Sequence, residues 1–483
     1  MADQKHNTSY TESVMDMLNT IQSPRNAMGL YQEAQEYFHN VDSDKAEIAK
    51  LSEQISVLVG ELSSASKEIH REHMVRLNSL EKQLKEEYSL QENKRLNRLS
   101  NALQVCLNII TISEGENYAD TQHKSSKFLG SILLISPGQG AQLSELHQRM
   151  KPAYKAVLSL RLLDKLLLDK MTTNKHILEY YDAEQRYDVQ NLFDSAFTHT
   201  VILPIMLAAM FQDIGLHHPE LIAMQKGEGG KDLFRVLEPE ERNYMLKLSH
   251  QYSLQYLHEG LGFQAYTGNS KAQRNEFELL EKKRLHFQTR LLQDAYSPEL
   301  GIGDIIKIPQ IYTSVVLSTK RDYLRKNLPT AAILIDQLGQ KKSISGAAAK
   351  AFINIVGYFP QGYGICNIPT DLRGIELDSY EFCIVNQLNP ANPQEPICRR
   401  VTRNLAYITS GESEAIKKTV NLHYPVARKK LIKIERVRLI QILEKLRYNF
   451  DPKEAHELIP EFWEPYEYFF VKKRQNLWTR ASK

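Results

Sequence analysis

A long stretch without proline, from about Ile48 to Leu103, constrains the fold more than any other part of the chain. Within it, apolar residues recur alternately three and four positions apart, a spacing that places them along one side of a helix as a heptad seam. The spacing slips between His73 and Leu77 and then resumes. The stretch therefore predicts a long amphipathic helix. Its seam comprises Ile48, Leu51, Ile55, Leu58, Leu62, Ala65 and Ile69, followed by Leu80 and Leu84.

Two interpretations of this seam stay open. The helix can pack against other parts of its own chain, or it can pair with a second copy as a coiled coil and form a homodimer through residues 48–103. The same apolar spacing serves both arrangements, so the periodicity does not choose between them.

The remaining pattern predicts a mainly α protein with four parts. At 483 residues the chain has room for about three folding units. Residues 115–150 show little periodicity, helical spacing then continues, and β-like runs between turn residues appear only after Gly346. These runs are AFINIVGYFPQGYGICNI, SYEFCIVNQL and EPICRRVTRNLAYIT. We expect an N-terminal helical arm with the heptad segment (1–150), an all-α domain (151–345), a small β extension (346–411) and a basic, helical C-terminal tail (412–483).

The charge balance argues against a dedicated nucleic-acid-binding protein. Lysine and arginine number 61 against 58 acidic residues, a net charge of +3. The tail is the exception, because ten lysines and arginines stand against two glutamates between Lys417 and Arg447. A basic run of this kind is either the solvated face of a helix that covers its own domain or a contact for nucleic acid or anionic lipid.

Cysteine content and hydropathy predict a soluble, cytoplasmic protein. The four cysteines lie far apart and have no metal-binding spacing, which is typical of a reducing compartment. The N-terminus lacks the apolar core of a signal peptide. The most apolar run, Val201–Phe211, is shorter than the roughly 18–20 residues that span a bilayer, and it predicts a buried helix.

A short polar motif follows this apolar run, and histidines recur downstream of it. The motif is Phe211-Gln212-Asp213-Ile214-Gly215; His250 lies in LEPEERNYMLKLSHQYSLQYL and His286 in EKKRLHFQTRLLQ. The order of these pieces resembles the HD-GYP family, all-helical metal-dependent phosphohydrolases that cleave cyclic di-GMP in bacteria. The resemblance covers roughly residues 170–405, where GYFPQGYGICNI and NPANPQEPICRRV look like the short β-extension that often follows the catalytic core.

The resemblance implies a histidine and carboxylate metal centre. In the family, such ligands hold two or three divalent cations, commonly iron or manganese, which lower the pKa of a bridging water and produce hydroxide. Carried onto this chain, it implies metal ligands at His176, Asp213, His250 and His286, and Asp213 as the catalytic residue if the protein is active. Gln212 and Gln310 stand where the family has a histidine and an aspartate ligand.

Further departures weaken the implied catalytic centre. The family's lysine after Ile-Gly is Leu216, its His-Pro is His250-Gln251, and its paired histidines are His286-Phe287. The Gly-Tyr-Pro signature is absent; its nearest remnant is Tyr296-Ser297-Pro298. The losses predict a degenerate domain that holds no metal or a single divalent ion.

Three other histidines lie near the motif. His199 stands 14 residues before Asp213, about 21 Å along a helix at about 1.5 Å per residue, too far to share a metal, so we expect a partly buried structural residue there. His217 and His218 are expected in a loop. Their alternative role is to face an anionic ligand in place of the missing lysine.

These observations predict a bacterial signalling protein that binds cyclic di-GMP or protein partners without hydrolysis. One alternative is an active metal-dependent cyclic di-GMP phosphodiesterase with a reduced iron or manganese centre. A second alternative is a scaffold protein with no nucleotide ligand. Nucleic acid is not an expected partner.

Overall fold

The computed structural model shows a mostly helical protein with a small module of antiparallel sheet near the C-terminus, followed by further helices, which confirms the predicted fold class. It describes residues 7–24, 28–62, 67–136, 141–187, 195–227, 229–230, 233, 235, 237–299, 301–320, 322–371, 373–447, 451 and 457–479.

The chain forms two compact units, and each is built from segments far apart in the sequence. The first unit comprises Met1–Asn19, Cys106–Met210 and Arg290–Lys483. The second comprises Thr20–Val105 and Phe211–Thr289.

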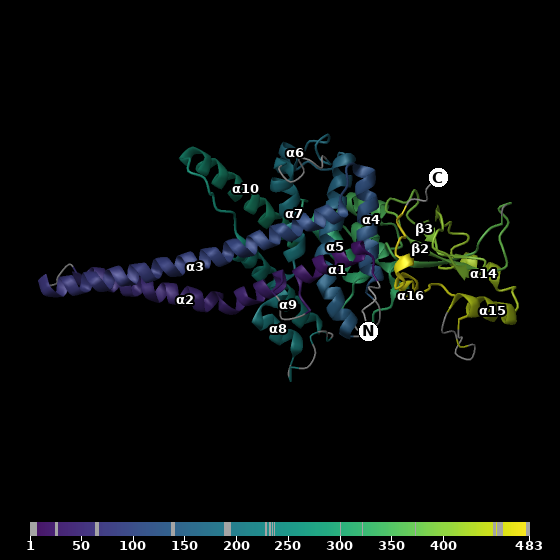
Figure 1. Ribbon diagram of the computed structural model, residues 1–483, viewed down its shortest axis with the longest axis horizontal. Coiled ribbons are helices and arrows are strands. Elements are labelled where there is room, and N and C mark those ends of the chain that lie inside the picture. Colours follow the sequence, from purple (N-terminus) through teal and green to yellow (C-terminus); the bar gives the residue numbers. More distant parts are fainter. Residues whose placement is uncertain are drawn as a thin grey trace. The chain divides into compact units, whose positions relative to one another are not determined.

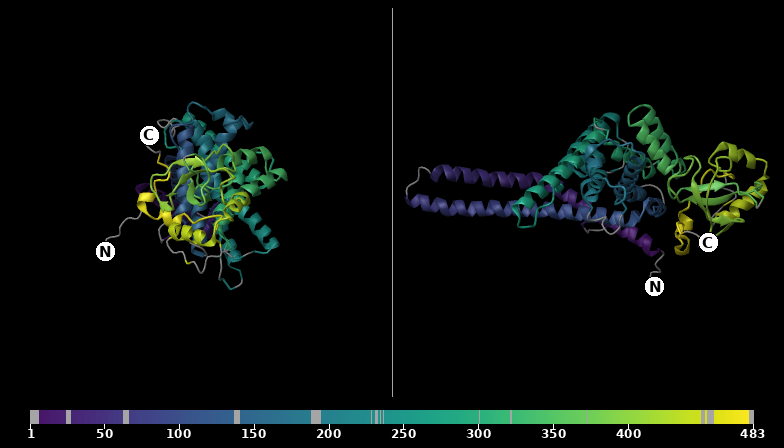
Figure 2. Two further views of the ribbon diagram at one scale, coloured as in Figure 1. Left: turned by 90° about the vertical axis from the view of Figure 1, so that its right-hand side faces the viewer. Right: turned by 90° about the horizontal axis from the view of Figure 1, so that it is seen from above.

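The heptad region lies in the second unit as two helices rather than one, so the expected long helix is wrong. Helix α2 (Leu30–Leu62) and helix α3 (Lys67–Ser113) run side by side in Figure 1 and again in the right-hand view of Figure 2. Their order is antiparallel, because Glu61 of α2 lies 3.8 Å from His73 and Glu33 accepts a 2.6 Å hydrogen bond from Asn101. We call this pair the hairpin.

The seam is buried along part of the hairpin. Leu51, Leu58 and Leu77 are buried within the single chain, whereas Ile69 is 48% exposed. Ala65 lies outside the described residues. Packing of the hairpin on its own chain therefore accounts for the buried part of the seam, and the homodimer through residues 48–103 stays a prediction.

The rest of the second unit is helical and follows the polar motif. Its elements are the 3₁₀ turn η2 (Ile214–His217), α8 (Pro219–Lys226), α9 (Pro239–Gln255), the π-helical turn η3 (Tyr256–Leu261) and α10 (Lys271–Tyr296). Helix α9 packs against η2 and α8, and α2 packs against η2, α8 and η3. These contacts hold the motif between α2 and α9.

Helix α5 is the centre of the first unit. Its residues from Ala153 to Leu163 are buried, so nearly every face of this segment meets another part of the unit, and α5 packs against α4, α11 and α13. The helices and helical turns of the unit's helical part are α1 (Ser9–Ile21), α4 (Tyr118–Leu134), α5 (Ala141–Leu168), α6 (Lys175–Tyr180), η1 (Thr198–Ile202), α7 (Leu203–Phe211), α11 (Asp304–Val316), η4 (Arg325–Asn327), α12 (Thr330–Gln340) and α13 (Gly346–Val356).

A buried network of two arginines and two carboxylates ties three segments of the first unit together. Arg161 and Asp164 come from α5, Glu114 follows α3, and Arg186 lies after α6. Arg186 donates to both carboxylates, at 2.9 Å to Glu114 Oε2 and 3.0 Å to Asp164 Oδ1. All four side chains are at most 2% exposed. Burial alone would raise the pKa of Glu114, but the charges of Arg186 and Arg161 outweigh burial and lower that pKa to about 2.

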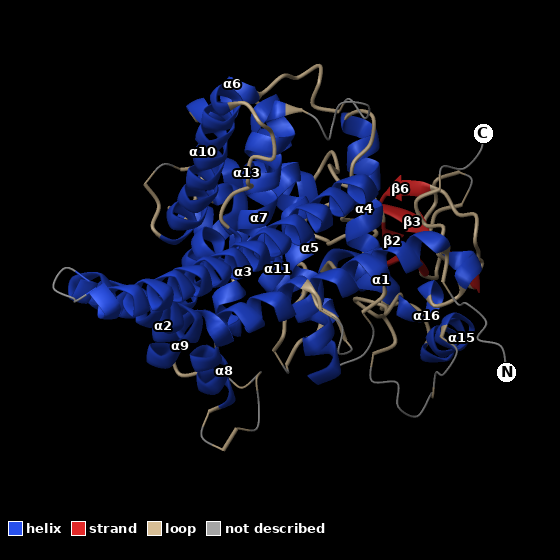
Figure 3. Ribbon diagram, turned by 60° about the vertical axis from the view of Figure 1, so that its left-hand side comes forward, coloured by secondary structure: helices blue, strands red, loops and turns tan. Residues whose placement is uncertain are grey.

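The sheet has the order β1-β2-β3-β6, and every neighbouring pair is antiparallel. In Figure 3 its strands gather in one place among the blue helices. Trp463 stacks on Phe382 with ring centroids 4.6 Å apart, and its indole nitrogen donates a 3.0 Å hydrogen bond to the carbonyl of Cys383. The strands of this sheet are β1 (Gly364–Asn367), β2 (Glu381–Val385), β3 (Ile397–Arg400) and β6 (Ser413–Ala415). The strands β4 (Thr402–Arg403) and β5 (Ala406–Tyr407) pair with each other as a separate two-stranded antiparallel sheet.

One β-like run is a helix, so that part of the sequence prediction is wrong. Residues AFINIV belong to α13, which begins at Gly346 and continues with three alanines. The side chain of Ser345 caps this helix by accepting a hydrogen bond from the Ala348 amide. The basic tail also folds into helices: α14 (Pro425–Leu431), α15 (Arg436–Leu446), α16 (Tyr466–Phe469) and the 3₁₀ turn η5 (Lys472–Arg474).

Within the described residues, no helix combines the length and the hydropathy that crossing a bilayer requires. The apolar run Val201–Phe211 forms the end of η1 and all of α7, and every one of its residues is buried, as the sequence predicts.

Candidate functional site

The polar motif turns sharply where α7 ends. Gln212 is buried, and Asp213 precedes the short turn η2. Gly215 lies against α9: its amide donates a 2.9 Å hydrogen bond to Ser253 Oγ, and an added Cβ would overlap the carbonyl of Ser249. A side chain at this position would push α9 away, so the glycine is a packing requirement.

His217 is buried and held by α2. Its Nδ1 lies 2.9 Å from Gln35 Nε2, and its ring lies edge-on to Tyr31 with centroids 4.8 Å apart. Burial lowers the pKa of His217 from 6.5 to about 4, against the opposing charge of Asp213. The imidazole is therefore neutral near pH 7. His217 is the last residue of the 3₁₀ turn η2, whereas the sequence predicted a loop residue.

His218 begins α8. Its Nδ1 accepts a hydrogen bond from the Glu220 amide at 3.3 Å, and its ring stacks on Tyr252 at 3.7 Å between centroids. Tyr252 in turn donates a 2.5 Å hydrogen bond to Glu220. Burial lowers the pKa of His218 as well. Both histidines of the pair thus have packing and hydrogen-bonding roles within the second unit.

The predicted metal ligands lie on separate elements. His176, on α6 of the first unit, is half-buried, and its Nε2 lies 2.9 Å from the carbonyl of Thr200 in η1. His250 on α9 is half-buried with a pKa lowered by burial, and His286 on α10 is exposed. Asp213 precedes η2. Gln310, on α11 of the first unit, is half-buried.

The chemistry of this donor set does not fit a two-metal centre of the kind that the resemblance implies. A carbonyl accepts only, so His176 Nε2 carries its proton and donates to Thr200. Gln212 and Gln310 offer neutral amides where charged or imidazole ligands are needed. Among the described residues, no three histidine, cysteine, aspartate or glutamate side chains form a group that could hold a metal. A single metal stays a prediction.

His199 differs from its expectation. Its side chain is exposed on η1, so the prediction of a partly buried residue is wrong. The reason is local: the π-helical turn buries Thr198, Thr200, Val201 and Ile202 and leaves position 199 outward.

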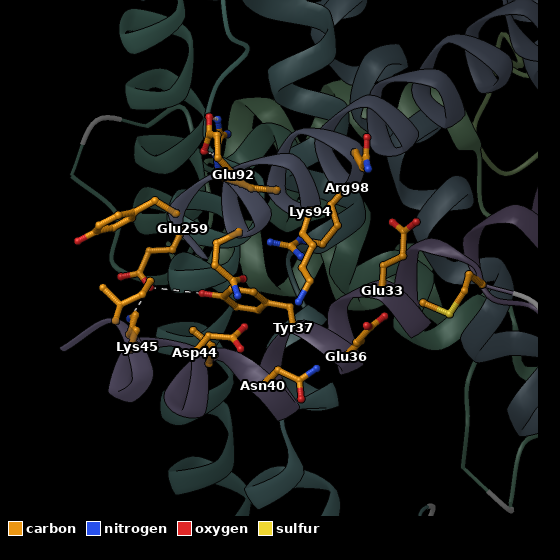
Figure 4. Close-up of a pocket in the computed structure, with 17 residues that line it drawn as sticks. Glu33, Glu36, Tyr37, Asn40, Asp44, Lys45, Glu92, Lys94, Arg98 and Glu259 are labelled. Atoms are coloured by element: carbon orange, nitrogen blue, oxygen red, sulfur yellow. Dashed lines mark hydrogen bonds and ion pairs between the residues drawn. The ribbon is translucent and has the colours of Figure 1, made fainter. Parts of the chain in front are cut away.

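A cavity of about 530 Å³ opens at the base of the hairpin, and we call it the hairpin cavity. Ligand sites usually measure about 300–1,000 Å³. Figure 4 shows its polar lining, with Glu33, Glu36, Tyr37, Asn40 and Asp44 contributed by α2 and Lys94 and Arg98 by α3. The remaining lining residues used below are Lys45, Tyr88, Glu92, Arg95 and Glu259.

An ion pair and three hydrogen bonds build the walls of the hairpin cavity. Lys45 lies 2.8 Å from Glu259, which also accepts a 3.3 Å hydrogen bond from the Tyr37 hydroxyl. Arg95 Nη1 donates to the carbonyls of Leu261 and Phe263, at 2.6 and 2.8 Å. These carbonyls lie at the end of η3, where unpaired backbone oxygens favour a cation.

Arg95 and Arg98 hold one wall of the hairpin cavity in place. Arg95 binds Glu92 at 2.6 Å. Arg98 donates to the Gly260 carbonyl at 2.9 Å and lies 5.1 Å from the centre of the Tyr37 ring. These two arginines therefore fix the wall of α3 against η3 and Tyr37.

The other charged groups of the hairpin cavity are available to a ligand. Glu36, Asp44 and Lys94 have no ion-pair or hydrogen-bond partner within the part of the chain that the structure describes. Burial raises the pKa of Glu33, against its hydrogen bond from Asn101 and the charge of Arg98. The cavity thus combines carboxylate acceptors, a free ammonium group and the aromatic rings of Tyr37 and Tyr88.

Sequence reasoning missed these residues. Most of them fall in the heptad region and just before it, where the sequence analysis singled out only the apolar seam. A signal was present in Arg95 and Arg98, because two arginines three positions apart share one helix face. Only the return of the chain as a hairpin places Tyr37 and Glu33 opposite them.

No protein-family model, curated protein or solved structure matches the chain.

Proposed function

We propose that the protein is a cytoplasmic bacterial signalling protein, similar in layout to a degenerate HD-GYP domain, that binds cyclic di-GMP in the hairpin cavity without hydrolysing it. The observation that carries the proposal is the mixed lining of that cavity, which includes Lys94, several carboxylates and two tyrosines. Other protein partners and the homodimer through residues 48–103 belong to the same signalling role.

A guanine nucleotide matches each part of this lining. Guanine presents N–H donors on its Watson–Crick edge, which carboxylates such as Glu36 and Asp44 accept. Its flat ring stacks on exposed aromatic side chains, here Tyr88, which is 54% exposed. The phosphates carry the negative charge that Lys94 and the guanidinium of Arg98 attract.

The arrangement of the histidines and carboxylates bears on the choice between binding and hydrolysis. His176 Nε2 is engaged with the Thr200 carbonyl, His217 Nδ1 with Gln35, and His218 Nδ1 with the Glu220 amide. A histidine that donates one ring N–H to a carbonyl keeps the lone pair of its other nitrogen, so these bonds alone do not decide against a metal. The support for binding without hydrolysis is that, among the described residues, no three histidine, cysteine, aspartate or glutamate side chains form a group that could hold a metal.

Calorimetric titration of the full chain with cyclic di-GMP tests the proposal. We expect saturable heat for the wild-type protein, and at least about tenfold weaker binding for Lys94→Ala and for Tyr88→Ala, because each removes one direct contact. Lys85→Ala is the matched control, since Lys85 is exposed on the same helix outside the hairpin cavity. An absence of heat with the wild-type protein contradicts nucleotide binding and favours the scaffold alternative.

A second measurement separates binding from hydrolysis. The protein is reconstituted with iron or manganese, its metal content is determined, and cyclic di-GMP is followed by chromatography. We expect the nucleotide to remain intact. Turnover together with two metals per chain would show the active phosphodiesterase instead.

A further inference from the structure

The corner between α14 and α15 exposes branched aliphatic side chains that most proteins bury. Ile432 is 70% exposed, Val437 64% and Val426 48%. The buried sides of the same helices already pack into the core under the sheet through residues such as Leu431 and Leu443. The exposed residues therefore do not belong to that core, and their apolar surface faces solvent.

Basic residues alternate with these exposed aliphatic residues along the sequence. Lys429, Lys433 and Arg436 are exposed and lie three or four positions apart. Lys433 lies 3.0 Å from Asp378, but both side chains are 69% exposed, so solvent screens that pair. Lys429 and Arg436 have no ion-pair partner among the residues that the structure describes. We call Val426, Lys429, Ile432, Lys433, Arg436 and Val437 the corner surface.

We propose that the corner surface docks on an anionic lipid bilayer. A surface that lies at a membrane interface needs aliphatic groups to enter the acyl boundary and lysines or arginines to meet the anionic headgroups, and the corner surface supplies both. Glu435 is the single acidic residue among residues 426–438, against six lysines and arginines, of which Arg428, Lys430 and Lys433 pair with acidic residues elsewhere in the chain. This role goes beyond nucleotide binding in the hairpin cavity and does not depend on it.

The composition of the corner favours lipid over nucleic acid. Residues 426–438 contain no aromatic side chain on which a base could stack. Contacts to phosphates use lysine and arginine but gain nothing from exposed isoleucine and valine. A nucleic-acid contact therefore gives no role to the exposed aliphatic side chains, whereas a lipid contact does.

Flotation of the full chain with lipid vesicles tests the proposal. We expect binding to phosphatidylcholine vesicles that contain about one third phosphatidylserine, and little binding to phosphatidylcholine alone. The variant Lys429→Gln/Lys433→Gln/Arg436→Gln should bind roughly 100-fold more weakly. Each lysine or arginine near an anionic surface contributes about a factor of five to affinity, and the variant removes three. Ile432→Ser/Val437→Ser should also bind more weakly, at unchanged net charge.

The matched control is Lys271→Gln/Lys282→Gln/Lys283→Gln, which removes the same charge from three exposed lysines of α10. We expect its vesicle affinity to stay within about twofold of the wild type, since only the lysines and the arginine of the corner surface contact the lipid headgroups. Equal loss in the control would overturn the proposal, because net charge alone would then explain binding. So would wild-type protein that fails to float with anionic vesicles, whether or not it binds DNA.

Discussion

Gln35 and His217 are joined across the second unit by a contact of 2.9 Å between amide Nε2 and imidazole Nδ1. The amide nitrogen only donates, so Nδ1 accepts and the ring proton lies on Nε2. This bond ties α2, which lines the hairpin cavity, to the turn that follows the polar motif. His217, which the sequence analysis considered for contact with an anionic ligand, thus connects the hairpin cavity to the polar motif through a neutral, buried ring.

The neutral state of His217 makes stability depend on pH. In the unfolded chain the imidazole takes up a proton near its ordinary pKa of 6.5, whereas burial lowers the folded pKa to about 4. The full stability is present above pH 6.5 and is lost as pH falls toward 4, by up to about 3 kcal/mol. Urea denaturation at pH 7 and pH 4.5 measures this loss.

The control is His217→Gln, which cannot titrate. His147 has a similarly lowered pKa of about 4 from burial and contributes its own pH dependence in both proteins. The variant should therefore keep part of the loss and show a shallower fall than the wild type. Identical pH profiles for the two proteins would contradict the buried, neutral state of His217.

Glu114→Gln should strongly destabilise the first unit. Glu114 accepts hydrogen bonds from both Arg161 and Arg186, and its removal leaves two buried guanidinium groups with one carboxylate, Asp164. Breaking one side of a buried ion network costs about 3–5 kcal/mol. Thermal and denaturant unfolding measure the change. Glu116→Gln, at an exposed position two residues later, should change stability by less than about 0.5 kcal/mol.

Gly215→Ala should destabilise the second unit by about 1–3 kcal/mol, because the added Cβ overlaps the Ser249 carbonyl and forces α9 outward. Gly60→Ala provides the opposite case on the hairpin. Nothing lies within 4 Å of a Cβ built there, and Gly60 is inside α2, so alanine should stabilise by about 0.5–1 kcal/mol. Denaturant unfolding compares both variants with the wild type, and equal effects would contradict this packing argument.

Glu36→Gln/Asp44→Asn should reduce the discrimination between cyclic di-GMP and cyclic di-AMP. In the proposed complex the carboxylates accept guanine N–H groups, whereas adenine lacks the same donor pair, so the change would remove a contact that only guanine makes. We expect a roughly tenfold weaker affinity for cyclic di-GMP and little change for cyclic di-AMP in parallel titrations. Unchanged selectivity would mean that these carboxylates do not contact the base.

Helix formation could be predicted from sequence where apolar residues mark the buried part of the segment, but not where small and polar residues are buried. The apolar run Val201–Phe211 was correctly predicted as a buried helix. Helix α4 was missed, because its buried face includes Ser125, Ser126, Gly130 and Ser131, which give no hydrophobic periodicity. The run AFINIV was wrongly predicted as a strand, because a short run of β-branched and aromatic residues fits a strand or a helix. The cap that Ser345 provides favours the helix.

The sequence also located only part of the candidate site. The sequence located the motif at Gln212 and Asp213 and the histidines that follow it, but not the hairpin cavity, whose two walls are separated by about fifty residues of chain. A side-chain pattern reports which face of a helix is apolar and does not report which other helix it meets.

The sequence by itself determined that the chain is mainly helical, with a small β segment before a basic helical end, because periodicity and turn residues act locally. Tertiary structure alone decided that the heptad region returns on itself as a hairpin, that Tyr37 meets Arg98, and that His217 is neutral. Each of these depends on contacts between distant segments, where burial and opposing charges set the packing and the pKa.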